Sequence, residues 1–124
     1  MRVLLDSHCL LWWLGDEPMS SAATAVIGDA ANAVYVSPAS IWELEIKAAL
    51  GKLAIDADLV EATEQAGMSW MPITAHHARA AARLPGHHRD PFDRMLLAQA
   101  HLEGCTIVTR DAIFSSYTSA LIQA

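Results

Sequence analysis

Val3-Leu4-Leu5-Asp6 is a short aliphatic run that ends in an acid, close to the beginning of the chain. Aliphatic residues in unbroken succession are typical of a strand that is buried on both faces, as in a parallel sheet. A helical pattern follows through residues 10–14 and ends at Gly15 and Pro18. The segment therefore predicts a buried strand that leads directly into a helix.

The same alternation of strand and helix continues along the chain. Further strands are predicted at Ala33–Val36, Trp70–Met71, Thr106–Val108 and Leu121–Ile122. Further helices are predicted from Ser20 or Ser21 to about Ala30, at Ala39–Leu50, at 58–66, at Thr74–Leu84, and from Pro91 to about Glu103. Short strands that alternate with helices predict an α/β fold, with a parallel sheet covered by helices on both sides.

Length and composition bound the class of protein. The 124 residues, 53% of them apolar, predict a single domain over residues 1–124 that buries its own core. The chain contains neither a long uncharged apolar stretch nor a signal-peptide pattern, so we expect a soluble cytoplasmic protein without a membrane segment. Cys9 and Cys105 lie in apolar surroundings and are expected to be buried, reduced thiols.

A formal charge of −6 argues against a protein that holds nucleic acid mainly by neutralising phosphates. Four of the eight Lys and Arg residues and four of the six His residues nevertheless fall between residues 76 and 94. This segment is either an anion-facing edge or a solvated helix face followed by a polar loop, and the sequence does not separate the two.

Acidic residues follow several of the predicted strands. Asp6 ends the first strand, Asp111 follows the strand at 106–108, and Glu43 lies on the helix that leaves the second strand. Asp90 and Asp93 open the helix at Pro91. Ligands of open α/β sheets bind beyond the carboxyl ends of the strands, where these acids are expected to gather. Clustered carboxylates suit Mg²⁺ or Mn²⁺, which could activate a water for phosphodiester hydrolysis.

Each acid also has a structural explanation. Asp90 precedes Pro91 in an arrangement typical of a helix N-cap, and capping is favoured there over catalysis. Asp6 and Asp111 can likewise cap the segments that follow them. Glu43 has Lys47 one turn later, which favours a surface ion pair.

Helical phasing of the segment 39–50 favours Glu43 over Glu45 as the functional acid. Glu43 shares a polar side with Ser40 and Lys47, whereas Glu45 falls within the apolar arc and is left without an explanation. A site filled with water and metal requires the polar side.

Four segments resemble, in order and spacing, the PIN-domain VapC toxins. They are Leu4-Leu5-Asp6-Ser7-His8, Ser37-Pro38-Ala39-Ser40-Ile41-Trp42-Glu43-Leu44, Asp90-Pro91-Phe92-Asp93-Arg94-Met95-Leu96-Leu97-Ala98-Gln99-Ala100 and Val108-Thr109-Arg110-Asp111. The resemblance covers nearly the whole chain. It implies a sheet of about five strands in the order 3-2-1-4-5, a metal-dependent endoribonuclease with Mg²⁺ or Mn²⁺, an RNA substrate, a VapB-type antitoxin and a homodimer.

The resemblance also implies roles for individual residues. The implied catalytic acids are Asp6, Glu43, Asp93 and Asp111, with Asp6 and Asp93 as metal ligands. Asp90, Thr109 and Ser7 are implied accessory residues, with Ser7 at a position where the family often has Thr and Thr109 placed to orient a carboxylate. Arg89 and Arg94 are the candidates to face RNA.

Two other functions compete with this interpretation. A metal-free ribonuclease would use His87 and His88 as general acid and base, but adjacent residues in an exposed loop seldom converge on one phosphate. A catalytically inactive binding module would use the acids only for structure or for capturing a basic antitoxin tail.

Of the four tryptophans, Trp13 is expected in the core, Trp12 is expected to be partly exposed, and Trp42 and Trp70 are expected in the core or an interface.

Overall fold

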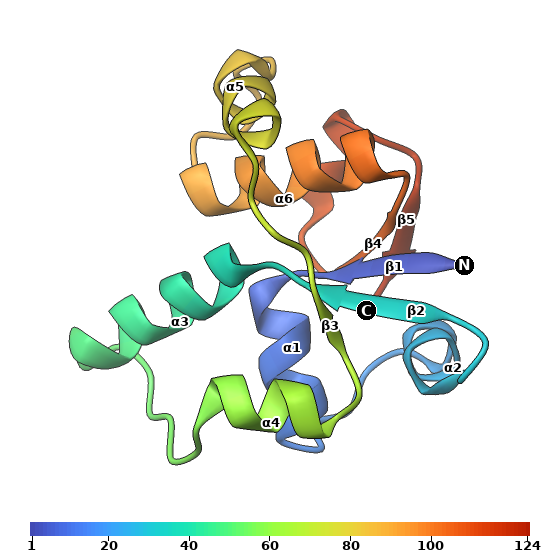
Figure 1. The fold of residues 1–124 in the computed structure, drawn as a ribbon, viewed down its shortest axis with the longest axis vertical. Helices are drawn as coiled ribbons and strands as arrows, with labels where there is room; N and C mark the ends of the chain where they lie inside the picture. Colours follow the sequence, from blue (N-terminus) through green and yellow to red (C-terminus); the bar gives the residue numbers. More distant parts are fainter.

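A computed structural model describes all residues from Met1 to Ala124, and its centre is a five-stranded sheet (Figure 1). The strands are β1 (Arg2–Leu5), β2 (Ala33–Val36), β3 (Ser69–Trp70), β4 (Thr106–Thr109) and β5 (Leu121–Gln123). Their order is β3-β2-β1-β4-β5, and all four pairings are parallel. The predicted α/β class and strand order are therefore confirmed. Strand β3 lies one residue earlier than predicted, because Ser69 and Trp70 are the residues in register with β2.

Helices form at all the predicted places. They are α1 (Ser7–Leu14), α2 (Ser21–Gly28), α3 (Pro38–Ala49), α4 (Leu59–Gln65), α5 (Ala75–Arg83) and α6 (Pro91–Glu103), with a short 3₁₀ helix η1 (Ala112–Ser116) after β4. Each α-helix begins after a residue whose side chain accepts a hydrogen bond from the first turn. These N-caps are Asp6, Ser20, Ser37, Asp58, Thr74 and Asp90. Helix α6 ends at Gly104, whose φ of 67° suits glycine.

Strand β1 is buried on both faces, as its aliphatic run predicts. Val3 and Leu5 point into one apolar cluster with residues of α1, α2, α3 and α4, whereas Leu4 joins a second cluster with α6 and η1. Helix α5 packs on α6, on the side of α6 away from the sheet (Figure 1). The molecule thus has helices on both faces of one sheet, and none of them is long and apolar enough to span a membrane.

The burial of sulfur and tryptophan side chains only partly follows the sequence predictions. Cys9 and Cys105 are buried free thiols, as expected, and desolvation raises the pKa of both, so they remain protonated. Trp13 packs against the first apolar cluster. Trp42, in contrast, is 65% exposed and meets Phe92 edge-on, with ring centroids 5.3 Å apart, so it does not belong to the core.

The topology brings several chain segments to one edge of the sheet. Because β1, β2 and β4 are parallel, their carboxyl ends lie together, and α1, α3 and η1 begin directly after them. Helix α3 also contacts α6, whose first turn lies toward the same edge (Figure 1). Asp6, Asp90, Asp93 and Asp111 fall at the starts of these helices, and Glu43 lies in the second turn of α3.

Candidate active site

Asp6 is the buried acid at the end of β1, and both of its carboxylate oxygens accept hydrogen bonds. Oδ1 accepts from the backbone N–H of Cys9 at 2.8 Å and so caps α1. Oδ2 accepts from the Thr109 hydroxyl at 2.6 Å. The same hydroxyl accepts from the Asp111 N–H at 3.0 Å. Thr109 therefore contacts a carboxylate, as predicted, and connects the acid after β1 with the acid after β4.

Glu43 points inward from α3 and is only 5% exposed. Its Oε1 accepts from the Ser7 hydroxyl at 2.8 Å, and its Oε2 pairs with the Lys47 ammonium at 3.0 Å. The pair with Lys47 is thus real, but it is not the surface pair that its spacing suggests. Ser7 contacts Glu43, so this accessory residue connects the start of α1 with α3.

The apolar arc assigned to α3 from the sequence was misplaced. Glu45 is exposed, whereas Ser40 and Glu43, on the predicted polar side, are buried. The Ser40 hydroxyl has no hydrogen-bond partner. The reason is that α3 turns its polar side toward the site, where α1 and α6 cover it. Which residues of α3 are buried therefore does not follow from their hydrophobicity alone.

Asp93, on the first turn of α6, has a histidine as its nearest polar partner. His88 Nε2 lies 2.6 Å from Asp93 Oδ2 and 3.8 Å from Asp111 Oδ2. One donor atom from each of these three side chains lies within 4.8 Å of the others. Asp6 and Glu43 are outside this group, and Asp6 is joined to it through Thr109.

The environment of Asp93 is unfavourable for a negative charge. Burial and the neighbouring Asp90 raise the pKa of the Asp93 carboxyl to about 6, with a smaller contribution from Glu43, although contact with His88 acts in the opposite direction. A carboxylate that is buried beside other carboxylates gains stability from a nearby cation. Among the groups that act on Asp93, only His88 favours its ionised form.

Asp90 and Asp111 are helix caps, as the sequence predicts. Asp90 Oδ1 accepts from the N–H groups of Phe92 at 2.8 Å and Asp93 at 3.3 Å. Asp111 Oδ1 accepts from the Ile113 N–H at 3.1 Å, which caps η1. Asp111 nevertheless directs its other oxygen toward His88, so capping leaves this acid available to the site.

His88, which the sequence suggests only as a metal-free acid–base partner of His87, lies beside Asp93 and Asp111 in the structure. The sequence predicts an exposed loop after Pro85 and Gly86, yet the His88 side chain is only 20% exposed. In the sequence, His88 stands five residues before Asp93. This spacing alone does not predict that the two side chains are in contact. His87, its neighbour, is exposed and stacks edge-on against Tyr117 instead.

Two residues of the supposed anion-facing edge have structural roles. The Arg94 guanidinium donates to five backbone carbonyls, those of Ala81, Ala82, Leu84, Pro85 and His88, so its N–H groups are engaged within the protein, which argues against the predicted RNA-facing role. His77 is buried and completes the capping box of α5 with Thr74. Arg94 is held because a planar five-donor side chain can bind several converging carbonyls. Arg89 is exposed.

The donor set at this edge suits a divalent cation. Mg²⁺ and Mn²⁺ favour carboxylate oxygens, and Mn²⁺ also accepts imidazole nitrogen. Asp93 and Asp111 each retain an oxygen that no backbone N–H occupies, and the surplus of negative charge around Asp93 favours a cation there.

Comparison with known proteins agrees with this architecture. The family model described as the PIN domain matches residues 3–119. The chain belongs to the PIN-domain family. This PIN domain is 29% identical over 118 residues to Ribonuclease VapC22 of Mycobacterium tuberculosis strain ATCC 25618 / H37Rv, an alignment that covers 93% of the chain and 91% of the relative.

Solved structures share the fold of this PIN domain at low sequence identity. VapBC2 from Rickettsia felis, bound to a promoter DNA fragment, aligns with a TM-score of 0.69 at 15% identity and covers 100% of this chain and 98% of its own. FitAcB from Neisseria gonorrhoeae gives 0.63 at 21% identity, covering 98% and 96%. VapBC-5 from Mycobacterium tuberculosis, of the VapBC family of toxin-antitoxin systems, gives 0.62 at 17% identity, covering 99% and 98%.

Proposed function

We propose that this PIN domain is a metal-dependent endoribonuclease, the toxin of a toxin–antitoxin pair. The observation that carries the proposal is the convergence of His88, Asp93 and Asp111 at the carboxyl edge of a parallel sheet, where burial and Asp90 disfavour a negative charge on Asp93. Similarity to a protein named Ribonuclease VapC22 supports RNA as the substrate.

Bound Mg²⁺ or Mn²⁺ would supply the charge that activates a water and neutralises the phosphodiester oxygens. The chain's own residues would hold and orient it. Asp93 and Asp6 are the proposed metal ligands, and each oxygen of Asp6 keeps a lone pair beyond the hydrogen bond that it accepts. Thr109 fixes the orientation of Asp6, and Ser7 fixes that of Glu43. Asp111 and Glu43 would add negative charge near the bound ion, with Glu43 held by Ser7 and Lys47.

Contacts to RNA would come from exposed cations near this edge. Arg89 lies between His88 and Asp90 and is exposed, so it is the proposed phosphate contact closest in sequence to the acids. Arg79 and Arg83 are exposed on α5. With a net charge of −6, the protein has little general attraction for RNA, and such local contacts would carry the binding.

A VapB-type antitoxin is the proposed protein partner. Similar solved structures are described as VapBC complexes, one of them as a toxin-antitoxin system. An arginine from the antitoxin would pair with the clustered carboxylates, because a guanidinium binds carboxylates bidentately. Equal affinity of the antitoxin for wild type and for an Asp6→Ala/Asp93→Ala variant would contradict this mode of inhibition.

The experiment that tests the enzyme is cleavage of single-stranded RNA by purified protein. Cleavage should require Mg²⁺ or Mn²⁺, stop in excess EDTA, and be lost in Asp93→Asn prepared in the same way. Full cleavage in EDTA by protein free of contaminating nuclease would reject the metal-dependent reaction. An absence of cleavage with every RNA and ion would favour a binding module.

A further inference from the structure

We infer that His88 is a nitrogen ligand of the divalent ion in this site. The inference rests on the proposed function, since it concerns an ion held by the same proposed ligand, Asp93, whereas Asp6 lies outside the group of His88, Asp93 and Asp111. It goes further by making the donor set mixed, with one imidazole among carboxylates. His88 Nε2 lies 2.6 Å from Asp93 Oδ2 and 3.8 Å from Asp111 Oδ2, so the ring edge points between the two acids.

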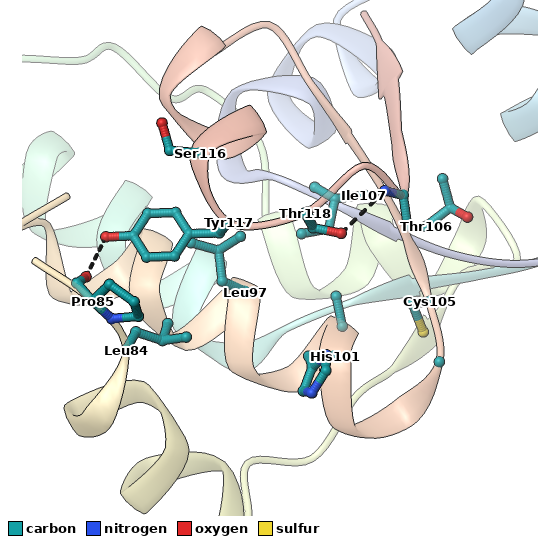
Figure 2. Close-up of a pocket in the computed structure, with 13 residues that line it drawn as sticks. Leu84, Pro85, Leu97, His101, Cys105, Thr106, Ile107, Ser116, Tyr117 and Thr118 are labelled. Carbon is teal, nitrogen blue, oxygen red and sulfur yellow. Dashed lines mark hydrogen bonds between the residues drawn. The ribbon is translucent and has the colours of Figure 1, made fainter. Parts of the chain in front are cut away.

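The backbone around His88 is held in place on both sides. Its N–H donates to the Tyr117 hydroxyl at 2.6 Å, and its carbonyl accepts from Arg94 Nη1 at 2.9 Å. The Tyr117 hydroxyl in turn donates to the Pro85 carbonyl at 2.6 Å, as Figure 2 shows. Tyr117 follows β4, and Arg94 belongs to α6. Two separate elements therefore fix the loop, and the imidazole is placed before any ligand arrives.

The two adjacent histidines, His87 and His88, direct their rings at different partners. His87 points its ring at Tyr117, with centroids 5.3 Å apart, and is exposed. The His88 ring instead lies 6.2 Å from the ring of buried Phe114, which leaves Nε2 directed at the carboxylates. A polar surface loop would leave both histidines exposed, whereas here the His88 side chain is largely covered and His87 is exposed.

A simple ion pair between His88 and Asp93 is the competing explanation. Such a pair uses Asp93 Oδ2 at 2.6 Å and leaves Asp111 Oδ2, 3.8 Å from the same ring nitrogen, without a hydrogen bond from His88. One cation between the three donor atoms satisfies all of them together. An imidazole ligand also changes selectivity, because nitrogen donors favour Co²⁺ and Ni²⁺ over Mg²⁺, whereas a purely carboxylate site does so less.

The test measures metal binding and spectroscopy on the full-length protein. Wild type, His88→Ala and the matched control His87→Ala are titrated with Co²⁺ and with Mg²⁺ by calorimetry. His88→Ala should lose Co²⁺ affinity by at least about tenfold and Mg²⁺ affinity much less, since even indirect partners of metal ligands change affinity by about tenfold or more. His87→Ala should match wild type.

The second readout is pulsed EPR of Mn²⁺ bound to the same proteins. Wild type and His87→Ala should show a ¹⁴N coupling that is absent in His88→Ala. His8→Ala should also keep the coupling, because His8 is exposed and stacks near Trp12.

Failure of this inference is distinguishable from failure of the proposed function. If Mn²⁺ binds to wild type, is lost in Asp93→Asn and shows no ¹⁴N coupling, His88 is not a ligand while the metal site stands. If no ion binds and RNA is cut in EDTA, both fall. An absence of ¹⁴N coupling in the wild-type spectrum contradicts the inference even if His88→Ala disturbs the loop.

Discussion

At the scale of single residues, capping and function share the same side chains. Asp6 caps α1 with one oxygen and accepts the Thr109 hydroxyl with the other. Asp111 caps η1 with one oxygen and faces His88 with the other. A carboxylate has two oxygens with two lone pairs each, so one acid can start a helix and also serve a site. For Asp6 and Asp111, capping a helix and facing the site are therefore not alternatives.

Asp93 and Asp90 should separate a functional acid from a capping acid. Asp93→Asn should abolish metal-dependent RNA cleavage with folding intact, because the amide keeps size but removes the charge. Asp90→Asn preserves an N-cap and should change neither activity nor melting temperature, whereas Asp90→Ala should lose about 1 kcal/mol of unfolding free energy. Cleavage rates and chemical unfolding of the three variants provide the measurement. Inactive, normally stable Asp90→Asn would instead make Asp90 part of the catalytic machinery.

The raised pKa of Asp93 predicts a pH dependence of stability in metal-free protein. Folding raises this pKa from 3.8 to about 6, so the folded state holds a proton that the unfolded chain releases between those values. The stability that this proton contributes is present at low pH and is lost as the pH rises through about 6. Urea unfolding from pH 4 to 8 should show wild type losing stability relative to Asp93→Asn mainly between pH 4 and about 6. Parallel curves for the two proteins would show that Asp93 titrates normally.

At the scale of elements, the loop from Leu84 to Arg89 depends on the helix that follows it. Arg94, on α6, ties this loop and the end of α5 together through five carbonyls. The first turn of α6 also contributes Asp90 and Asp93. One helix terminus thus organises both the acids and the histidine that faces them.

Replacing Arg94 by Lys should loosen this loop. A lysine ammonium has three donors and no planar fork, so most of the carbonyl contacts would be lost, at a cost of about 1 to 3 kcal/mol of unfolding free energy. Hydrogen exchange should show faster exchange at residues 84–89, together with weaker metal binding. The exposed Arg89→Lys serves as the control and should stay within about 0.5 kcal/mol of wild type. Unchanged exchange in Arg94→Lys would show that these bonds do not order the loop.

At the scale of the whole molecule, we propose that exposed apolar side chains of α3 take part in a homodimer. Trp42 is 65% exposed and Leu50 is 64% exposed, both at α3 or its end. A homodimer, which the sequence resemblance implies, would remove such side chains from water. Light scattering should give twice the chain mass of 13.4 kDa, and Trp42→Ala should shift the equilibrium toward monomer if this side chain lies in the contact. Leu102→Ala, at the far end of α6, is the comparison variant. A monomer at the highest soluble concentration would reject the dimer.

The sequence by itself determined the elements and their class. The unbroken run Val3-Leu4-Leu5 predicts burial on both faces, and Asp90-Pro91 predicts the start of α6, because these signals depend on backbone geometry and on neighbours within one turn. The confirmed α/β class follows from the alternation of such local signals. The strand order came from the resemblance of four segments to a known family, since no local signal specifies which strands pair.

Only the tertiary structure decided which side chains meet. The sequence predicts that Arg94 faces RNA, but in the structure its guanidinium donates to the carbonyls of a preceding segment. The sequence also predicts an exposed His88, but hydrogen bonds of its backbone with Tyr117 and Arg94 hold its loop beside the acids. The burial of Glu43 instead of Glu45 likewise depends on α1 and α6 covering the polar side of α3. Hydrophobic phasing assumes that the buried side is the apolar side. That assumption fails at a site where polar groups converge, because there hydrogen bonds between elements compensate for burial.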